Sequence, residues 1–133
     1  MIGWVKRVIE LGDLTRFRAQ FLTPREIFYQ GENKKIPRNV INYLRSPISL
    51  AVWYMDDGGR RTDCLALRLS THCFPWDEQK LLQECLRKNF LINMNIHRVS
   101  GEMFQLYIPS NEAKKFCRII KPHIISSMRY KLL

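Results

Sequence analysis

The feature that most constrains the fold is a short apolar segment, residues 47–57, which has helix signals at both ends. Ser46-Pro47 joins an N-cap residue to the residue favoured at the first helical position, and Gly58-Gly59 follows the last turn. Between these signals the helix is apolar on every side, whereas a surface helix carries a polar stripe. We therefore expect a helix buried on more than one face, against its own domain and a second, similar unit.

Asp56 and Asp57 lie at the carboxyl end of this helix, where the helix dipole disfavours a carboxylate by roughly some tenths of a kcal/mol. A divalent cation held by carboxylate oxygen and by the carbonyls of the helix end would offset this cost, and hard oxygen ligands suit Mg²⁺. Such a site supports metal-assisted hydrolysis of phosphodiesters. On the Asp-Asp-Gly-Gly segment alone, the alternative is an ordinary polar turn after a helix.

The sequence after this helix predicts two pairs of strands and two amphipathic helices. A basic turn at residues 60–61 leads to a half-buried strand, because Leu65, Leu67 and Leu69 alternate with Ala66, Arg68 and Ser70. Residues 75–89 have apolar side chains at helical spacing, and residues 92–97 alternate before turning at 100–102 into 103–108. A last helix, residues 110–121, begins with a Ser/Asn cap and stops before Pro122. The predicted order is αββαββα.

Residues 1–46 are predicted to form an N-terminal β-hairpin and linker, distinct from a domain at residues 47–133. Residues 3–11 and 14–21 alternate about Gly12-Asp13 as in a β-hairpin, with Arg16 and Arg18 on one face. Residues 30–39 are polar and interrupted by glycine and proline, which indicates a linker.

Composition limits the partners of the chain. The excess of 22 Lys and Arg over 12 Asp and Glu favours a polyanionic partner, although ribosomal and membrane-surface proteins share this character. Cys64, Cys73, Cys85 and Cys117 lack metal-ligand spacing and have apolar neighbours, which indicates buried side chains in a reducing compartment. Because no apolar run approaches the ~18 residues of a membrane span, we expect a soluble, intracellular protein without membrane partners.

The segment LAVWYMDDGG, residues 50–59, resembles the LAGLIDADG motif in the variant form of two-motif, I-SceI-like homing endonucleases. The segments KKIPRNVINYL, LSTH and IIKPHIISSMRYKL are also similar to this family, so that the resemblance covers roughly residues 14–133. It implies an α+β fold, in which an αββαββα half forms a four-stranded antiparallel saddle on DNA. It also implies a site-specific double-strand DNA endonuclease of the intron homing type, with Mg²⁺ as cofactor.

The resemblance assigns roles to individual residues. Asp57 matches the metal ligand of the family, and the carbonyl of Asp56 assists, although the family varies at that position. His72 falls at the position that orders water near the scissile phosphate, and Lys131 matches an active-site lysine. His72 and Lys131 are equally compatible with ordinary surface positions.

The outward side chains of the saddle are expected to contact bases or phosphates, since Asn and Gln pair with adenine edges and Arg with guanine. A merely solvated sheet face is the alternative for each of them. The candidate contacts are Arg16, Arg18, Arg60, Arg61, Arg68, Ser70, Asn93, Asn95, His97 and Gln105.

The family packs two such helices together, each with an aspartate, whereas this sequence contains one motif. It resembles the C-terminal half of a two-motif enzyme, in which residues 1–46 correspond to the end of the preceding repeat. We expect the second to come from an identical chain or a separate partner chain, because Trp53 or Tyr54 would otherwise lie exposed. The alternatives are an RNA maturase that binds intron RNA without cutting DNA and, outside the family, a basic ribosome-associated protein. The resemblance is compatible with an organelle or a prokaryotic cytoplasm.

Overall fold

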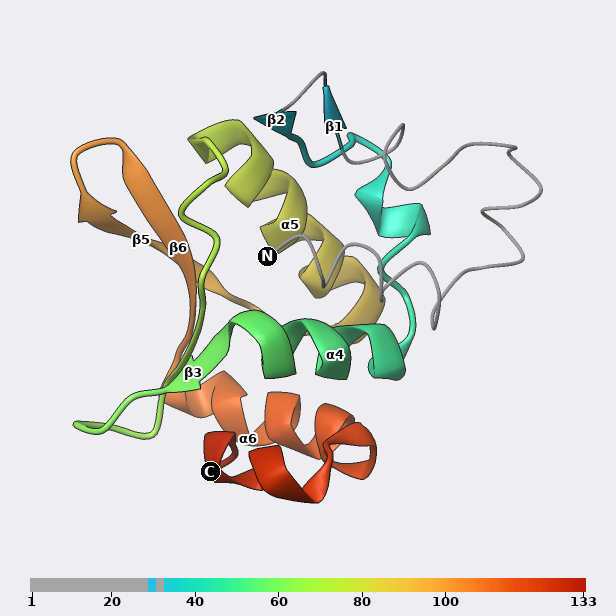
Figure 1. Ribbon diagram of the computed structural model, residues 1–133, viewed down its shortest axis with the longest axis vertical. Coiled ribbons are helices and arrows are strands. Elements are labelled where there is room, and N and C mark those ends of the chain that lie inside the picture. Colours follow the sequence, from blue (N-terminus) through green and yellow to red (C-terminus); the bar gives the residue numbers. More distant parts are fainter. Residues whose placement is uncertain (1–28, 31–32) are drawn as a thin grey trace.

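The computed structural model describes residues 29–30 and 33–133, and the element labels follow Figure 1. The predicted hairpin at residues 3–21, with Arg16 and Arg18, lies outside the described residues. The described elements are β1 (Tyr29–Gln30), β2 (Asn33–Lys34), η1 (Val40–Asn42), α4 (Pro47–Asp57), β3 (Gly58–Arg60), β4 (Leu67–Leu69), α5 (Trp76–Phe90), β5 (Asn95–Ser100), β6 (Met103–Ile108), α6 (Ser110–Ile120), η2 (Lys121–His123) and η3 (Ser126–Lys131).

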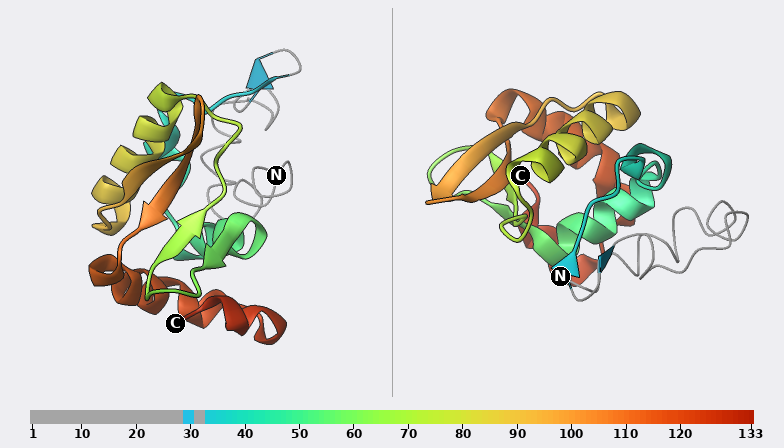
Figure 2. Two further views of the ribbon diagram at one scale, coloured as in Figure 1. Left: turned by 90° about the vertical axis from the view of Figure 1, so that its left-hand side faces the viewer. Right: turned by 90° about the horizontal axis from the view of Figure 1, so that it is seen from above.

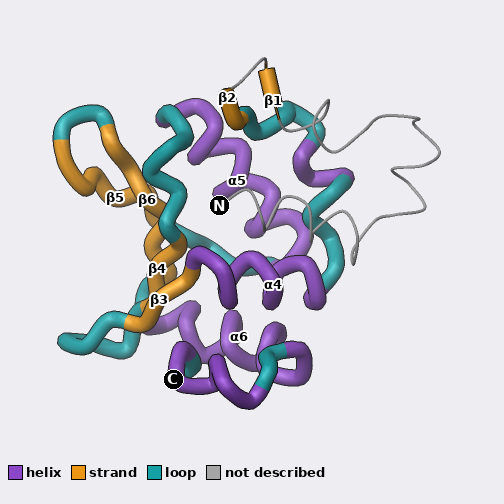
Figure 3. The backbone as a smooth tube through the Cα atoms, viewed as in Figure 1, coloured by secondary structure: helices purple, strands orange, loops and turns teal. Residues whose placement is uncertain are grey.

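Strands β3 to β6 form a four-stranded sheet in the order β3-β4-β6-β5, and every neighbouring pair is antiparallel. From α4 onward the elements follow the order αββαββα, which confirms the predicted α+β fold. Helices α4 and α5 lie on the same side of the sheet, and α6 packs below α4 (Figures 1 and 2). Among the described residues, no helix covers the other face of the sheet, which is therefore open (Figures 2 and 3).

Helix α4 begins as its sequence predicts. The Ser46 Oγ accepts a hydrogen bond from Ile48 N at 3.2 Å, and Pro47 occupies the first helical turn. The residues from Ser49 to Tyr54 are all buried. Trp53 and Tyr54 are both 0% exposed, so the expectation that one of them needs a second unit to cover it is wrong. For Tyr54 the cause is α6, since its ring meets the ring of Phe116 edge-on at 5.3 Å.

The start of the sheet differs from the prediction. Gly58 and Gly59 form strand β3 together with Arg60, where we expected a helix end followed by a turn. The next strand begins only at Leu67, so Leu65 is 51% exposed, and Ala66 is buried in its place. The backbone bond from Arg61 N to Ala66 O, 3.0 Å, closes the connection between the strands. The predicted alternation holds where the ladder exists, at residues 67–69.

The helices after the sheet match their predicted ranges closely, but two local expectations are wrong. Helix α6 has Pro109 at its N-cap without a side-chain cap bond, so the predicted Ser/Asn cap is absent from this helix. Cys85 and Cys117 are buried as expected, whereas Cys64 and Cys73 are exposed. The exposed pair lies in the loops that flank β4, where no element packs over them.

The end of the predicted N-terminal unit packs onto the core. Residues 36–44 contribute the buried side chains of Ile36, Val40 and Leu44. Asn89 of α5 donates from its Nδ2 to Ile41 O at 2.8 Å and to Leu44 O at 2.7 Å. A division of the chain at residue 46 stays a prediction, but residues 36–44 are anchored to α5.

None of the helices within residues 29–30 and 33–133 has both the length and the apolar character that crossing a bilayer requires.

Candidate metal and nucleic-acid site

The carboxyl end of α4 is held by two distant parts of the chain. The Met55 carbonyl accepts a hydrogen bond from Lys131 Nζ at 2.7 Å, and the Asp57 carbonyl accepts one from Ser70 N at 2.9 Å. These two donors satisfy carbonyls that the helix does not pair internally. The last bond of the helix itself runs from Gly58 N to the Tyr54 carbonyl. Asp57 is therefore carried on a fixed helix end, with its Oδ2 covered from solvent, while Asp56 is exposed.

Gly58 allows the chain to turn from this helix end into strand β3. A Cβ atom at this position would overlap both the ring and the carbonyl oxygen of Tyr54. A side chain is thus excluded next to Asp57 by close approach rather than by backbone angle, because the φ of Gly58 is −84°. Close packing against Tyr54 therefore explains why position 58, directly after the acidic pair, is a glycine.

The C-terminal segment lies against the same helix end. The buried Tyr54 hydroxyl donates to the Lys131 carbonyl at 2.6 Å, and Arg60 Nη1 donates to the Leu132 carbonyl at 3.2 Å. Burial raises the pKa of Tyr54 well above its ordinary value, so the hydroxyl stays protonated and remains a donor. The structure thereby brings Lys131, a predicted active-site residue, to the helix end that carries Asp57.

The outer face of the sheet collects several of the predicted nucleic-acid contacts. The register forms a row across the four strands. Arg68 of β4 lies between Gly59 of β3 and Tyr107 of β6, and Asn95 of β5 lies on the other side of Tyr107. His97 lies opposite Gln105 on the same face. The side chains on the other face, among them Leu67, Leu69, Leu106 and Ile108, are buried under the helices.

Tyr107 lies in the middle of this outer face and was missed by the sequence reasoning. Its ring stacks on the His97 imidazole, with centroids 4.1 Å apart and an interplanar angle of 17°. The Arg61 guanidinium lies 5.8 Å from the centroid of the same ring. The sequence contained this signal, because Tyr107 lies two residues after Gln105 along β6 and so shares its face.

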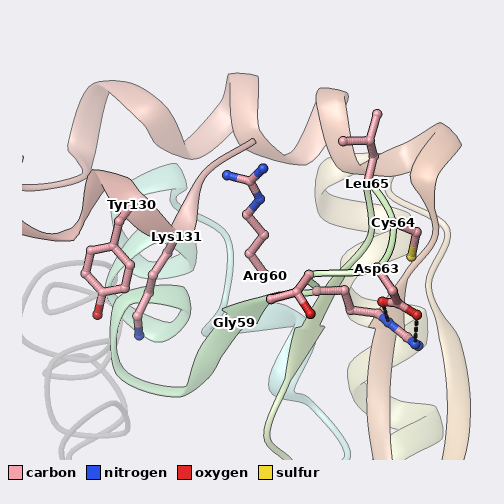
Figure 4. Close-up of a pocket in the computed structure, with 9 residues that line it drawn as sticks. Gly59, Arg60, Asp63, Cys64, Leu65, Tyr130 and Lys131 are labelled. Carbon is pink, nitrogen blue, oxygen red and sulfur yellow. Dashed lines mark hydrogen bonds and ion pairs between the residues drawn. The ribbon is translucent and has the colours of Figure 1, made fainter.

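Arg61 is held in place by a two-pronged ion pair with Asp63. Its Nε and Nη2 donate to the two carboxylate oxygens at 2.8 and 2.6 Å. The hydrogen bond from Arg61 lowers the pKa of the Asp63 carboxyl, so both partners stay charged near neutral pH. A hollow of about 690 Å³ lies between this loop and residues Tyr130 and Lys131 (Figure 4).

Other predicted contacts lie outside the paired strands of this face or on its other side. Arg60 pairs with Leu67, a residue of the buried face, and Figure 4 shows its side chain pointing away from the Asp63 carboxylate. Asn93 precedes β5, and its backbone N–H donates to Glu112 Oε2 at 3.1 Å. Ser70 follows β4 next to the helix end, and the half-buried His72 lies in the turn after Ser70.

The chemistry of the helix end fits one ligand of a hard divalent cation. Mg²⁺ is commonly bound through one or two carboxylates, with waters and substrate phosphates completing its shell. Asp57 is a carboxylate that could supply one such ligand. The described residues contain no group of three or more His, Cys, Asp or Glu side chains that could hold a metal by themselves.

Comparison with known proteins identifies the family. Residues 13–116 match the model of the LAGLIDADG DNA endonuclease family. The chain is 30% identical over 131 residues to the cytochrome b mRNA maturase bI2 of Debaryomyces hansenii, covering 98% of this chain and 48% of the maturase. It is 34% identical over 113 residues to the probable intron-encoded endonuclease 1 of Wickerhamomyces canadensis, covering 80% of this chain and 48% of that protein.

A solved structure shares the fold as well. The homing endonuclease I-WcaI, bound to its DNA recognition sequence, superposes with a TM-score of 0.72 at 33% identity, over 80% of this chain and 49% of the other. The chain belongs to the LAGLIDADG DNA endonuclease family. It spans about half of each of these three relatives.

Proposed function

We propose that the chain is one half of a site-specific, metal-dependent DNA endonuclease of the intron homing type. The observation that supports this proposal is that the helix end with Asp57 is directly connected to the open face of the sheet. Asp57 ends α4, and the next residue begins strand β3 of the sheet whose open face carries Arg68, Tyr107 and Gln105. A duplex lying on that face would pass the helix end, so that recognition and cleavage would use one rigid unit.

In this proposal the sheet reads the duplex in its major groove. Arg68 can bind guanine in a bidentate manner, and Asn95 and Gln105 can pair with adenine. Arg61 presents its charge at the rim of the face, where phosphates position the duplex without reading sequence. Arg60 remains a candidate for phosphate contacts from the other side of its strand, as does Asn93 beyond the end of β5.

At the helix end, Asp57 would hold Mg²⁺ with help from the Asp56 carbonyl. The cation, when bound, supplies Lewis-acid stabilisation of the cleaved phosphate. Lys131 can act beside it, because an ammonium group has three donors and only one of them is used on the Met55 carbonyl. His72 would order a water from the loop after Ser70. A phosphate oxygen could accept the remaining Lys131 donors.

We propose that a second LAGLIDADG unit completes the site, from an identical chain or a separate one. The support is chemical, since one carboxylate leaves most of a cation shell unfilled. The chain also spans 49% of I-WcaI, the relative whose structure contains DNA.

The alternative function is an RNA maturase that binds intron RNA and does not cleave DNA. The observation in its favour is the extent of the similarity, because the match to the bI2 maturase covers 98% of this chain and that to the Wickerhamomyces endonuclease covers 80%. Both functions use a basic binding face, and they differ in the need for Asp57.

The substitution Asp57→Asn separates these functions. The assembled protein should lose cleavage of a duplex selected from a randomised library, while its affinity for that duplex persists. Without metal the fold should be unharmed or stabilised by up to about 1 kcal/mol, because a negative charge leaves a helix C-terminus. Asp77→Asn removes the same charge from an exposed position in the first turn of α5 and serves as the control.

Cleavage and melting temperature are measured on each variant with Mg²⁺ and with a chelator. An Asp57→Asn protein that melts earlier and still cuts would refute the metal-ligand assignment. A wild-type protein that binds intron RNA tightly and never cuts duplex DNA would support the maturase instead.

A further inference from the structure

Two polar side chains, those of Thr71 and Gln79, are completely buried beside the sheet. Both residues are 0% exposed. Gln79 lies in the second turn of α5, on the helix face that also buries Leu82 and Leu86. Burying an amide and a hydroxyl costs free energy unless each polar atom finds a partner, and an apolar side chain would fill this position without that requirement.

Every polar atom of this pair has a partner. The Thr71 hydroxyl donates to Gln79 Oε1 at 2.7 Å and accepts from Leu106 N at 3.2 Å. Gln79 Nε2 lies 2.5, 3.2 and 3.1 Å from the carbonyl oxygens of Thr71, Phe74 and Phe104, so its two N–H donors are shared among three acceptors. One glutamine thus ties helix α5 to both ends of the loop between β4 and α5 and to strand β6.

The loop between β4 and α5, residues 70–75, connects the helix end that carries Asp57 with the open face of the sheet. Ser70, the residue before Thr71, donates its N–H to the Asp57 carbonyl at 2.9 Å, and His72 follows directly after Thr71. On the other side, Phe104 and Leu106 flank Gln105, a residue of the open sheet face. A path of hydrogen bonds, with the peptide bond between Ser70 and Thr71 as one link, therefore runs from the end of α4, through the loop, to strand β6 of the open sheet face.

We propose that Gln79, acting with Thr71, is a positioning residue that fixes His72 and the Asp57 end of α4 relative to the sheet. The inference rests on the proposed function, because it assigns the network to the cleavage step. The side chains proposed to contact the duplex, Arg68 and Gln105, lie on strands that are also held by their pairing with neighbouring strands, so they depend less on the loop than His72 and Asp57 do. Loss of the network should therefore slow cleavage much more than it weakens binding.

The test compares Gln79→Leu with Gln83→Leu. Gln83 lies one turn further along α5 and donates its Nε2 to the Met94 carbonyl at 2.7 Å, so the control removes a similar bond that does not reach the loop. Thr71→Val removes the hydroxyl with little change of shape, and Thr71→Ser restores it. The Thr71 pair keeps the test valid if Gln79→Leu fails to fold.

The first readout needs no activity. In the folded full chain, Gln79→Leu and Thr71→Val should shift or broaden the NMR signals of the His72 imidazole and speed hydrogen exchange at Ser70 N–H. Gln83→Leu and Thr71→Ser should leave both near wild type. Unchanged His72 signals and Ser70 exchange in the folded Gln79→Leu or Thr71→Val protein would overturn the inference, whether or not the chain proves to be an endonuclease.

The second readout is the cleavage rate of the assembled protein on saturating duplex, set against its dissociation constant. Misplacement of a group near the reacting centre costs on the order of 10- to 100-fold in rate. We expect such a loss for Gln79→Leu and Thr71→Val, a change in affinity below about twofold, and recovery in Thr71→Ser. Equal losses in Gln83→Leu would show that only stability was affected and would overturn the inference. A wild-type protein without nuclease activity would instead refute the proposed function, and the NMR result would still decide the positioning of the loop.

Discussion

Replacement of Lys131 by methionine tests whether this residue holds the end of α4 independently of catalysis. Methionine keeps a long, unbranched side chain but removes the ammonium group that donates to the Met55 carbonyl at 2.7 Å. Lys131 is partly buried, and the carbonyl belongs to the last turn of the helix. The substitution therefore removes both a hydrogen bond and a favourable charge at a helix C-terminus.

The expected loss follows from these two contributions. A hydrogen bond of this kind contributes about 0.5–1.5 kcal/mol, and a cation at a helix C-terminus adds about 0.3–1 kcal/mol at a screened position. Together the free energy of unfolding should fall by about 1–2 kcal/mol, which lowers the melting temperature of a domain of this size by roughly 3–8 °C. Lys131→Arg should recover part of this loss.

Thermal unfolding followed by circular dichroism measures the effect without any nucleic acid. Arg129→Met is the matched control, because it removes a positive charge from an exposed position two residues earlier in the chain. If Lys131→Met and Arg129→Met melt at the same temperature, the bond to Met55 contributes no stability and the reasoning fails. A cleavage defect in Lys131→Arg, at an unchanged melting temperature, would then belong to catalysis alone.

Two further predictions concern the turn after α4 and the open face of the sheet. Gly58→Ala should destabilise the chain by about 1–3 kcal/mol, because its Cβ overlaps Tyr54, whereas a Cβ at Gly59 lies 3.5 Å from its nearest neighbour and should cost much less. Chemical denaturation of Gly58→Ala and Gly59→Ala measures this difference, and equal midpoints would contradict it. Binding to duplex DNA should weaken steeply with salt, and a wild-type binding constant that is flat in salt would exclude this binding mode. Arg61→Gln should reduce the slope of log K against log salt by up to about 1, because Arg61 is the proposed phosphate contact, whereas Lys114→Gln on α6 should leave the slope unchanged.

The elements that could be predicted from the sequence are those specified by local signals. Ser46-Pro47 marks the start of α4 by an N-cap and a residue that suits the first turn, and both act within a few residues. The turn at Gly101 likewise depends on one residue, whose φ is +50°. Alternation placed Gln105 and Asn95 on one face, because the period of a strand is two residues.

The elements that sequence reasoning missed depend on contacts between distant segments. Strand β3 contains two glycines and forms because β4 pairs with it, so no local preference announces it. Leu65 is apolar yet exposed, since its alternation with Leu67 extends beyond the strand that is formed. The burial of Trp53 and Tyr54 within the chain could not be anticipated either, because an apolar helix does not reveal which surface covers it.

In the candidate site, too, the residues specified by local signals could be predicted and those that depend on distant contacts could not. Asp57 could be named as a candidate metal ligand because its motif is contiguous, and its place at the end of α4 follows from the helix signals around it. The pairing of Thr71 with Gln79 was missed, because polar residues at these positions look like exposed ones until the fold is known. Tyr107 was missed although its strand was predicted and its position, two residues after Gln105, places it on the same face.

The bonds that hold the end of α4 join residues that are synthesised far apart in time. Tyr54 and Lys131 are separated by 77 positions in the sequence, whereas Ser70, whose N–H holds the Asp57 carbonyl, lies much nearer to α4. On a ribosome, α4 and the first strands can form while the segment that contains Lys131 is still untranslated. Contacts of such long range also form late in folding, because a large loop must close first. A nascent chain would therefore acquire the bond between Ser70 and Asp57 before it acquires the bonds that join Lys131 to Tyr54 and Met55.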